Sequence, residues 1–553
     1  MHEISQRYYV DEERDGYYVP SMIKRAWSAC LEDYLALEAV CKDNGIRVFA
    51  TWGTLIGAIR HGGFIPWDDD IDVMMLREDY EKLEQIVGKD PERGYHLQDF
   101  RMTHQNNIVR QWLNKSVLLY DAEEWEKRHG FPYGSVIDIF ILDHIPADEG
   151  ERLNHARTIG ACTELQGLAQ ELYGEKTLRN PKRESPAFRK KWSETEKLLG
   201  HRISFSKDRG APVWVQILSA LDDFLAGYAH RSGADAGVAD IPFYLNDRNN
   251  RLLPGRYFET AVEVPFEWGT MMVPAGYDSI LRRYFGNYQY PGIWPDTHVY
   301  PFYEKSKKLL KERFNFEFPT FSIDSKVLDN VENHKCDKET LNNDENRSIE
   351  TEKSELEYSS RTNTTIDRQI VFLCDRPEHW QWLEPFWREA NRDPGNHILV
   401  LALPFQYKDA QGLIADNNWE VDTDGYPTEV EVVSGLAYDI TTGQPDELYY
   451  TFPYDAYDSA RMPHPAYFSE FMRDYAETMV LVTPFRLRNI YEWDTHSRYT
   501  LGEFLRTPGV LYADRVYVAS ENTRQIAVEL LSGWTGDAVR WEEKIWRTGD
   551  YAG

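Results

Sequence analysis

Cysteine is scarce in this sequence, and no two cysteines form a metal-binding or redox pair. The 553 residues include 5 cysteines, an odd number, scattered without any C-x-x-C spacing. Disulfide frameworks and zinc ribbons need closely spaced pairs, so the pattern argues against both classes and favours a reducing compartment.

Long hydrophobic runs and a secretory leader are also missing. Residues 1–18 are polar and acidic, without the basic start and apolar stretch of a signal peptide, and no long uncharged apolar run follows. We therefore expect a cytoplasmic protein with no transmembrane segment.

Positive charge is outnumbered by negative charge. Lys and Arg total 62 against 91 Asp and Glu, which gives a net charge of −29. Such a chain repels nucleic acid and anionic membranes at long range, so we expect no nucleic-acid partner. An anionic ligand would need a local basic site or a bound metal.

Length and composition indicate two domains joined by a linker. With 42% hydrophobic and 14% aromatic residues the chain can form packed cores, but 553 residues exceed one ordinary core. Residues 323–367 are polar, highly charged and nearly free of aromatics, which is typical of linkers. We expect a first domain over residues 1–322 and a second over residues 368–553.

Both domains alternate helix and strand patterns. In the first, an amphipathic helix with Ser21 as its N-cap and Gly45 as its C-cap glycine precedes short strands, and residues 151–230 are mainly helical. The second opens with a βαβ pattern over residues 368–404. The predicted fold class is therefore α/β.

The stretch TWGTLIGAIRHGGFIPWDDDIDVMML, Thr51 to Leu76, carries the strongest chemical signal. If the acids run into a strand, its two-residue period puts Asp70 and Asp72 on one face. Two carboxylates on one face invite Mg²⁺ or Mn²⁺, which commonly bridges protein acids to a substrate phosphate. The alternative is a solvated acidic turn.

Further residues would complete such a site. Asp138 interrupts an apolar strand pattern, where an acid either binds metal or caps a neighbouring helix. Gly53 and Thr54 follow a strand and precede a short helix, a setting that receives a phosphate or simply turns the chain. Arg60 and Arg110 could neutralise a leaving diphosphate or form ordinary surface ion pairs.

The acidic stretch resembles the signature of the LicD/fukutin-type phosphotransferases of the nucleotidyltransferase-fold superfamily. The similarity continues in GSVIDIFILDHIP, from Gly134, and in VPAGYDSILRRYFGNYQYPG, from Val273. Together these segments bracket residues 25–303. The resemblance implies an α+β nucleotidyltransferase-fold domain with helical additions. From the βαβ pattern of residues 368–404 we expect a smaller Rossmann-like α/β domain to follow it.

The resemblance also implies an activity and roles for the site residues. Asp70 and Asp72 would be the paired metal ligands, Asp138 the third carboxylate, and Gly53–Thr54 the donor-phosphate contact. The family typically moves the alcohol phosphate of a CDP-linked alcohol, such as phosphocholine from CDP-choline, to a sugar hydroxyl and releases CMP. The implied acceptor is a glycan or teichoic-acid-type precursor, as in lipopolysaccharide or teichoic acid modification, which would bring the protein to a membrane only peripherally. Asp138 or Asp69 would help to take the acceptor proton.

Two features leave the donor and the second domain open. Trp52, Trp67 and Trp112 could bind a choline ammonium by cation–π contact, although aromatics beside strands are more often core residues. Residues 368–553 more faintly resemble the first Rossmann-like half of CDP-glycerol glycerophosphotransferase-type enzymes. We interpret them as an accessory domain that binds an acceptor or a partner.

Two rival functions stay open at this point. One is a catalytically silent nucleotidyltransferase-fold scaffold or binding protein, against which the retained acids argue, because a scaffold has no need to hold like charges together. The other is a nucleotidyltransferase that moves NMP from an NTP. Release of pyrophosphate instead of CMP would identify it.

Overall fold

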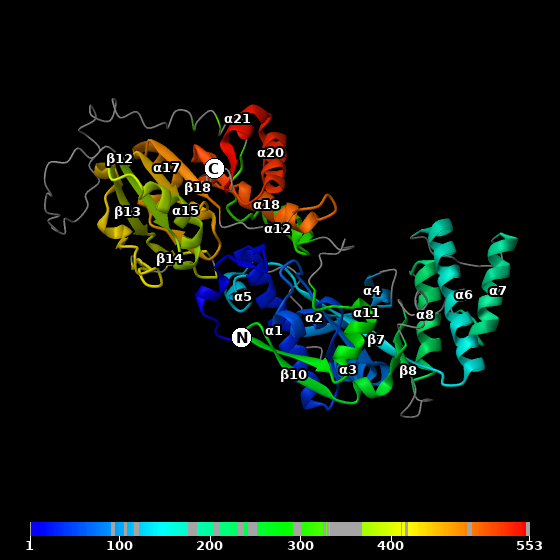
Figure 1. The fold of residues 1–553 in the computed structure, drawn as a ribbon. Coiled ribbons are helices and arrows are strands. Elements are labelled where there is room, and N and C mark those ends of the chain that lie inside the picture. Colours follow the sequence, from blue (N-terminus) through cyan, green and yellow to red (C-terminus); the bar gives the residue numbers. More distant parts are fainter. Residues whose placement is uncertain are drawn as a thin grey trace.

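The computed structural model describes most of the chain, and Figure 1 shows its parts in a row. A sheet domain from the first half of the sequence lies in the middle, a layer of helices lies at one end, and a C-terminal sheet domain lies at the other. The described residues are 2–89, 94–103, 108–114, 121–174, 185–203, 211–229, 237–241, 252–290, 300–323, 328, 331, 368–410, 412–414, 418–483 and 489–548.

Among these residues, seven strands form the mixed sheet of the first domain, in the order β3-β4-β7-β6-β5 with β8 beside β7 and β9 beside β8. The β4–β7 pair is parallel and the other neighbours are antiparallel. The strands are β3 (Phe49–Ala50), β4 (Ile71–Leu76), β5 (Tyr95–Gln98), β6 (Arg110–Asn114), β7 (Val136–Ile145), β8 (Gly237–Asp240) and β9 (Leu253–Pro254).

Helices α1 (Ser21–Asp43) and α3 (Arg77–Lys89) cover one face of this sheet. Trp112 of β6 is fully buried and donates from Nε1 to the carbonyl of Asp33 in α1 at 3.2 Å. Arg110, two residues earlier and on the same face, lies over the ring of Tyr80 in α3. The other face is covered by α2 (Trp52–Ile56) and α11 (Tyr277–Phe285), and it carries the polar residues described below.

The helical layer has its own core and joins the sheet through buried charges. It comprises α6 (Glu149–Tyr173), α7 (Pro186–Leu199) and α8 (Val213–Ala226). Asp222 of α8 accepts hydrogen bonds from Arg77 at 3.0 Å and from Arg101 and Arg110 at 2.7 Å each. Burial alone would raise the pKa of Asp222, but the three arginines lower it well below its ordinary value. This carboxylate therefore connects α8 to the sheet.

We predict that Asp222→Ala destabilises the protein strongly. The substitution leaves three guanidinium groups without their shared buried carboxylate, and breaking a buried ion pair in this way costs about 3–5 kcal/mol of unfolding free energy. The neighbouring Asp223 is exposed, so Asp223→Ala should change stability by less than about 0.5 kcal/mol. Urea unfolding of both variants measures the difference, and equal midpoints would contradict the assigned role.

Seven described strands form an all-parallel sheet in the second domain, in the order β15-β13-β12-β16-β18-β19-β20. The chain first builds outward from β12 on one side and then returns to build outward on the other, so the order reverses between β12 and β16. The strands are β12 (Arg368–Cys374), β13 (Asn396–Ala402), β15 (Val432–Ser434), β16 (Glu447–Tyr450), β18 (Thr478–Val482), β19 (Arg515–Val518) and β20 (Ile545–Arg547).

The remaining elements pack around these two sheets. The longer helices of the second domain are α15 (Trp380–Ala390), α17 (Ser469–Tyr475), α18 (Thr495–Leu505), α20 (Glu521–Thr535) and α21 (Ala538–Lys544). Shorter elements are β1 (Glu12–Arg14), β2 (Tyr17–Val19), α4 (Phe100–Thr103), α5 (Ala122–Glu126), β10 (Ala261–Phe266), β11 (Gly269–Pro274), α12 (Glu304–Phe314), β14 (Phe405–Tyr407), α16 (Ile440–Gly443), β17 (Arg461–Pro463) and α19 (Pro508–Tyr512).

The two sheet domains contact each other through hydrogen bonds and aromatic rings. Arg25 of α1 donates to the carbonyl of Ser459 at 3.0 Å, and Tyr499 of α18 donates to Glu304 of α12 at 2.8 Å. The rings of Tyr300 and His496 meet edge to face at 4.6 Å. The second domain is thus attached to the first by specific contacts.

The predicted α/β fold class is confirmed, with a mixed sheet first and a Rossmann-like parallel sheet second. The predicted linker, residues 323–367, lies almost entirely outside the described residues. In the described part of the chain no helix has both the length and the apolar character needed to cross a bilayer.

Candidate active site

Asp72 and Asp138 lie side by side on neighbouring parallel strands. The register pairs Asp72 of β4 with Asp138 of β7, so both side chains leave the same face of the sheet. Both residues are half-buried, whereas Ile71 and Ile137 beside them are fully buried on the opposite face. The structure therefore brings together two of the three carboxylates that the sequence singles out.

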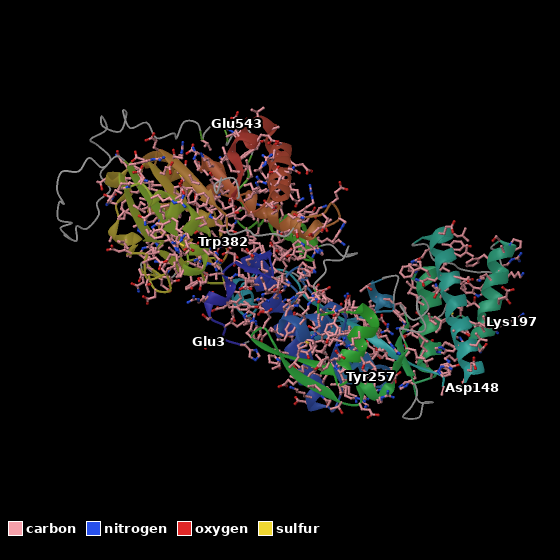
Figure 2. The ribbon with its side chains drawn as sticks, in the orientation of Figure 1. Glu3, Asp148, Lys197, Tyr257, Trp382 and Glu543 are labelled. Carbon is pink, nitrogen blue, oxygen red and sulfur yellow. The ribbon has the colours of Figure 1, made fainter. Side chains whose placement is uncertain are left out.

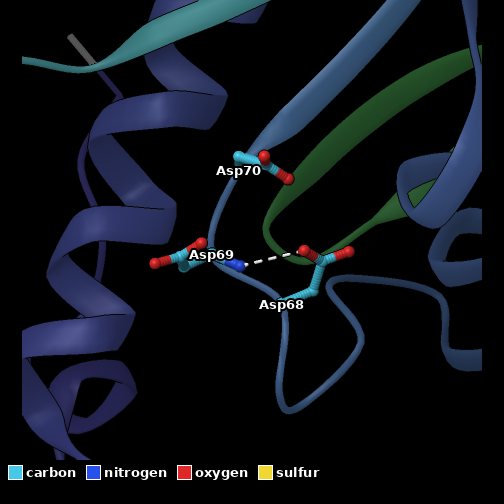
Figure 3. Close-up of side chains that lie close together, drawn as sticks. All are labelled: Asp68, Asp69 and Asp70. Carbon is cyan, nitrogen blue, oxygen red and sulfur yellow. Dashed lines mark hydrogen bonds between the residues drawn. The ribbon is translucent and has the colours of Figure 1, made fainter. Parts of the chain in front are cut away.

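Three acids cluster in the loop that leads into β4. Asp68, Asp69 and Asp70 each place a carboxylate oxygen within 4.8 Å of the others. Figure 3 shows Asp68 and Asp70 projecting to one side of the loop and Asp69 projecting to the other, toward α1. The expected trio joined Asp70 to Asp72 and Asp138. Among the described residues, the structure instead clusters the three acids of the loop.

Buried contacts on both sides fix this loop. Trp27 of α1 donates from Nε1 to the carbonyl of Asp68 at 2.8 Å. Asp69 is fully buried, and its Oδ2 accepts the backbone N–H of Phe302 at 2.6 Å. The N–H of Asp69 in turn donates to Asp68 Oδ1 at 3.2 Å, the dashed line in Figure 3. The directions of Asp68 and Asp70 are set by these anchors.

The turn after β3 approaches the acids closely. Trp52 adopts a positive φ of 45°, an uncommon conformation for a bulky residue and one that clusters at functional sites. A Cβ on Gly53 would lie 2.3 Å from Asp68 Oδ2, so any side chain at this position would displace the Asp68 carboxylate. The sequence predicted that Gly53 and Thr54 precede a short helix. In the structure they lie within the first turn of α2, because the helix already begins at Trp52.

Thr54 positions β4 directly. Its Oγ1 accepts the backbone N–H of Asp72 at 2.9 Å, and the residue is only 4% exposed. The phosphate contact expected at Thr54 stays a prediction, but its hydroxyl oxygen orients the backbone of Asp72.

Gln111 is a site residue that the sequence analysis missed. It is the register partner of Asp138 on β6, and its Nε2 donates to Asp138 Oδ1 at 2.8 Å. Gln98 of β5 donates to Gln111 Oε1 at 2.8 Å, which fixes the orientation of the amide. In the sequence, Gln111 could be recognised only as a polar residue next to the apolar Trp112. The strand register is needed to show that Gln111 faces Asp138.

Arg60 links the acidic stretch to the last segment that resembles the family, the closing motif that begins at Val273. It lies in the helical turn Gly57–His61 that follows α2, and its Nη1 donates to the carbonyl of Tyr288 at 2.7 Å. Burial lowers the pKa of this half-buried guanidinium. The end of the closing motif, from Pro291, lies outside the described residues.

The structure does not bring Arg110 to the carboxylates. Its register partner is Ile139, so it lies on the sheet face opposite Asp138. There it is 2% exposed and bonded to Asp222 of the helical layer. Arg110 therefore forms a buried structural ion pair, whereas the sequence had left open only a diphosphate contact or a surface ion pair.

An aromatic group borders the acidic face. Trp52 stacks on Tyr284 of α11 with centroids 5.3 Å apart, and Phe140, two residues after Asp138 on β7, meets Trp52 at 6.0 Å. Of the other two tryptophans considered for a choline box, Trp112 is core, and Trp67 packs edge to face against Tyr17 and His61. Only Trp52 of the three therefore neighbours Phe140 on the acidic face.

The donor set of this site suits a hard divalent cation. The loop contributes the carboxylates of Asp68–Asp70, and the shared face of β4 and β7 contributes those of Asp72 and Asp138. Mg²⁺ and Mn²⁺ prefer such oxygen ligands. Like charges held this close repel each other unless a cation or a proton is shared. The Asp68–Asp70 cluster can therefore bind a metal.

Residues 45–141, which contain these strands and acids, match the family model described as "LicD/FKTN/FKRP, nucleotidyltransferase domain". This part of the chain is a LicD-type nucleotidyltransferase domain. All seven residues singled out from the sequence lie within it.

Curated relatives match part of the chain at moderate identity. The lipopolysaccharide cholinephosphotransferase LicD of Haemophilus influenzae is 33% identical over 118 residues, which are 21% of this chain and 43% of that protein. The ribitol 5-phosphate transferase FKRP of Homo sapiens is 41% identical over 61 residues, 10% of this chain and 12% of that protein. The chain thus spans less than half the length of the curated relatives it matches.

We predict that Thr54→Ala destabilises the protein while Thr54→Ser largely preserves it. Alanine leaves the buried N–H of Asp72 without an acceptor, which costs about 1–3 kcal/mol, whereas serine keeps the oxygen. Thr163 is exposed on α6, so Thr163→Ala is the matched control. Thermal melting ranks the three variants; a Thr54→Ser variant as unstable as Thr54→Ala would show that packing of the methyl group, not the hydrogen bond, matters.

Proposed function

We propose that this protein is a metal-dependent phosphotransferase. It moves an alcohol phosphate from a CDP-activated donor to a hydroxyl of a cell-surface glycan or teichoic-acid precursor and releases CMP. The observation that carries the proposal is the register of Asp72 against Asp138 inside a LicD-type nucleotidyltransferase domain. The scattered cysteines, of which the described ones are unpaired and buried, support a cytoplasmic location.

Asp70, Asp72 and Asp138 are the proposed metal ligands, with Asp68 beside them. Bound Mg²⁺ or Mn²⁺ supplies positive charge for the donor diphosphate, in a protein whose own net charge is strongly negative. The chain orients these ligands through neutral groups. Thr54 holds the backbone of Asp72 and Gln111 holds the carboxylate of Asp138, and neither partner cancels the charge that a cation needs.

The structure favours Asp138 over Asp69 as the group that takes the acceptor proton. Asp69 is fully buried and bonded to the backbone N–H of Phe302. Asp138 is half-buried on the shared acidic face, and Gln111 fixes one of its oxygens. A positioned carboxylate within reach of the acceptor hydroxyl meets the geometric requirement of a general base.

The donor alcohol is proposed as a choline or a polyol phosphate. The relatives are named for these two classes, a cholinephosphotransferase and a ribitol 5-phosphate transferase. The Trp52, Tyr284 and Phe140 rings beside the acids offer an aromatic surface for a quaternary ammonium. This surface supports choline, whereas a ribitol or glycerol phosphate would not need it.

A thermal-shift titration tests the proposal. Purified protein is titrated with Mg²⁺ or Mn²⁺ and crossed with CDP-choline, CDP-ribitol, CDP-glycerol, CTP and ATP, because ligands that bind the native state raise its melting temperature. We expect a metal-dependent shift selective for one CDP-alcohol. A shift with CTP or ATP and pyrophosphate as product would point to NMP transfer, and a flat response in every combination would favour the scaffold.

We predict that Asp72→Asn removes turnover without unfolding the protein. Losing a proposed ligand should lower turnover by more than about 100-fold, beyond the loss typical of outer-sphere changes. Removing one of several mutually repelling charges should leave melting in the absence of metal unchanged or raised. Asp43→Asn, at an exposed position at the end of α1, is the matched control. An unfolded Asp72→Asn variant would mark this acid as structural.

A further inference from the structure

A polar cleft of about 480 Å³ lies in the second domain, away from the acids described above. It opens beside the carboxyl ends of β12 and β16, where the strand order of the parallel sheet reverses. Open α/β sheets bind their ligands at this switch point. The volume is within the range of small-molecule sites.

Two domains build the walls of this cleft. Arg376 and His379 come from the connection between β12 and α15, Trp382 comes from the first turn of α15, and Arg461 comes from β17. The opposite wall is the N-terminal strap, residues 7–13. Figure 2 labels Trp382, which lies where the C-terminal domain faces the blue N-terminal segment. The strap therefore closes over a switch point that would otherwise be open.

A buried network holds the floor of the cleft rigid. Asp375, directly after β12, accepts from Arg461 Nη2 at 2.8 Å and contacts His379 Nδ1 at 2.6 Å. Arg376 Nη2 lies 2.8 Å from His379 Nε2. Because a guanidinium can only donate, Nε2 must accept and Nδ1–H donates to Asp375. Burial pushes the pKa of Asp375 up, but His379 and the two arginines hold it well below its ordinary value.

Asp11 of the strap faces two arginines of the cleft without forming a hydrogen bond to either. Asp11 Oδ1 lies 3.7 Å from Arg376 Nη2 and 4.0 Å from Arg461 Nη2, distances too long for hydrogen bonds. Within the described residues this oxygen and Arg461 Nε have no hydrogen-bond partner, although Arg461 is only 2% exposed. Buried polar atoms are rarely left in this state. A hydroxyl both donates and accepts, so it can bridge a carboxylate and a guanidinium.

The charges of the lining argue against a phosphate or nucleotide. The turn after β12 reads Cys374-Asp375-Arg376-Pro377, an acid and a proline where dinucleotide-binding sheets have a glycine-rich phosphate loop. Four carboxylate residues line the cleft against three arginines: Glu12, Glu13, Glu378 and Asp422 against Arg7, Arg376 and Arg461. Trp382 and Tyr407 add aromatic surface.

We infer that this cleft binds a neutral saccharide, held by Arg376 and Arg461 on one wall and by the Glu12 and Glu13 carboxylates of the strap on the other. Paired acids and guanidiniums satisfy sugar hydroxyls, and the aromatic rings cover the apolar face of the sugar. The site shares no residue with the LicD-type acidic site, so saccharide binding stands or falls independently of the proposed transfer reaction.

Hydrogen exchange of the full-length protein with neutral disaccharides tests this inference. Maltose, lactose and N,N′-diacetylchitobiose are each added at about 10 mM, where even a millimolar site is mostly occupied. We expect at least one of them to slow exchange in both the strap, residues 7–13, and residues 376–382. No protection by any of the three, or protection confined to other segments, would overturn the inference.

Two variants test the location of the saccharide site, and an anionic sugar tests its preference for neutral ligands. Arg376→Gln removes one of the two guanidiniums that β12–α15 and β17 place in the cleft wall and should weaken disaccharide binding, measured by calorimetry, about tenfold or more. Arg392→Gln, at an arginine of the same domain whose side chain is 76% exposed, should change binding less than about twofold. Glucose 1-phosphate should bind no more tightly than maltose. Tighter binding of the phosphate, or equal loss in both variants, would contradict a neutral saccharide site.

Discussion

Two carboxylates held side by side on parallel strands set the requirements for the rest of the first domain. Asp72 and Asp138 are register partners, and at such a spacing their charges repel. The fold keeps them together through neutral groups, the hydroxyl of Thr54 and the amide of Gln111. Because these groups orient the acids without neutralising them, the two carboxylates keep a concentrated negative charge that a divalent cation can neutralise.

The loop before β4 depends on contacts from distant parts of the chain. Asp69 faces away from Asp68 and Asp70 and binds the backbone of Phe302. On either side of Phe302, Tyr300 meets His496 of the second domain and Tyr303 stacks on Tyr133. The segment that anchors the acidic loop is therefore itself clamped between the two domains, which gives the second domain a structural link to the acids.

The sequence could predict which segments are strands and which are helices, because apolar periodicity and turn residues are visible within a few neighbouring residues. The expected strand at the acids is β4, the βαβ pattern expected over residues 368–404 is β12, α15 and β13, and α6, α7 and α8 lie where a mainly helical stretch was expected. The boundaries differ by a few residues. Ser21, expected as the N-cap, is the first residue of α1, and Pro20 takes the N-cap position.

The candidate site could be predicted in part. Period-two alternation predicted that Asp70 and Asp72 share a strand face, but β4 begins at Ile71, so Asp70 belongs to the preceding loop. The pairing of Asp72 with Asp138 needs the register of strands more than 60 residues apart in the sequence. The same non-local register puts Arg110 on the opposite face and Gln111 beside Asp138. The tight packing of Asp68 over Gly53 likewise arises from a loop closing onto a turn, which no local pattern encodes.

Anomalous diffraction from crystals soaked in Mn²⁺ together with a CDP-alcohol tests the central claim most directly, because it locates the metal without relying on turnover. The account predicts an anomalous peak bounded by Asp70, Asp72 and Asp138, with the donor diphosphate on its open side and Asp69 still bonded to Phe302. A fully occupied peak elsewhere on the molecule, or nucleotide bound with these three carboxylates uninvolved, would contradict it.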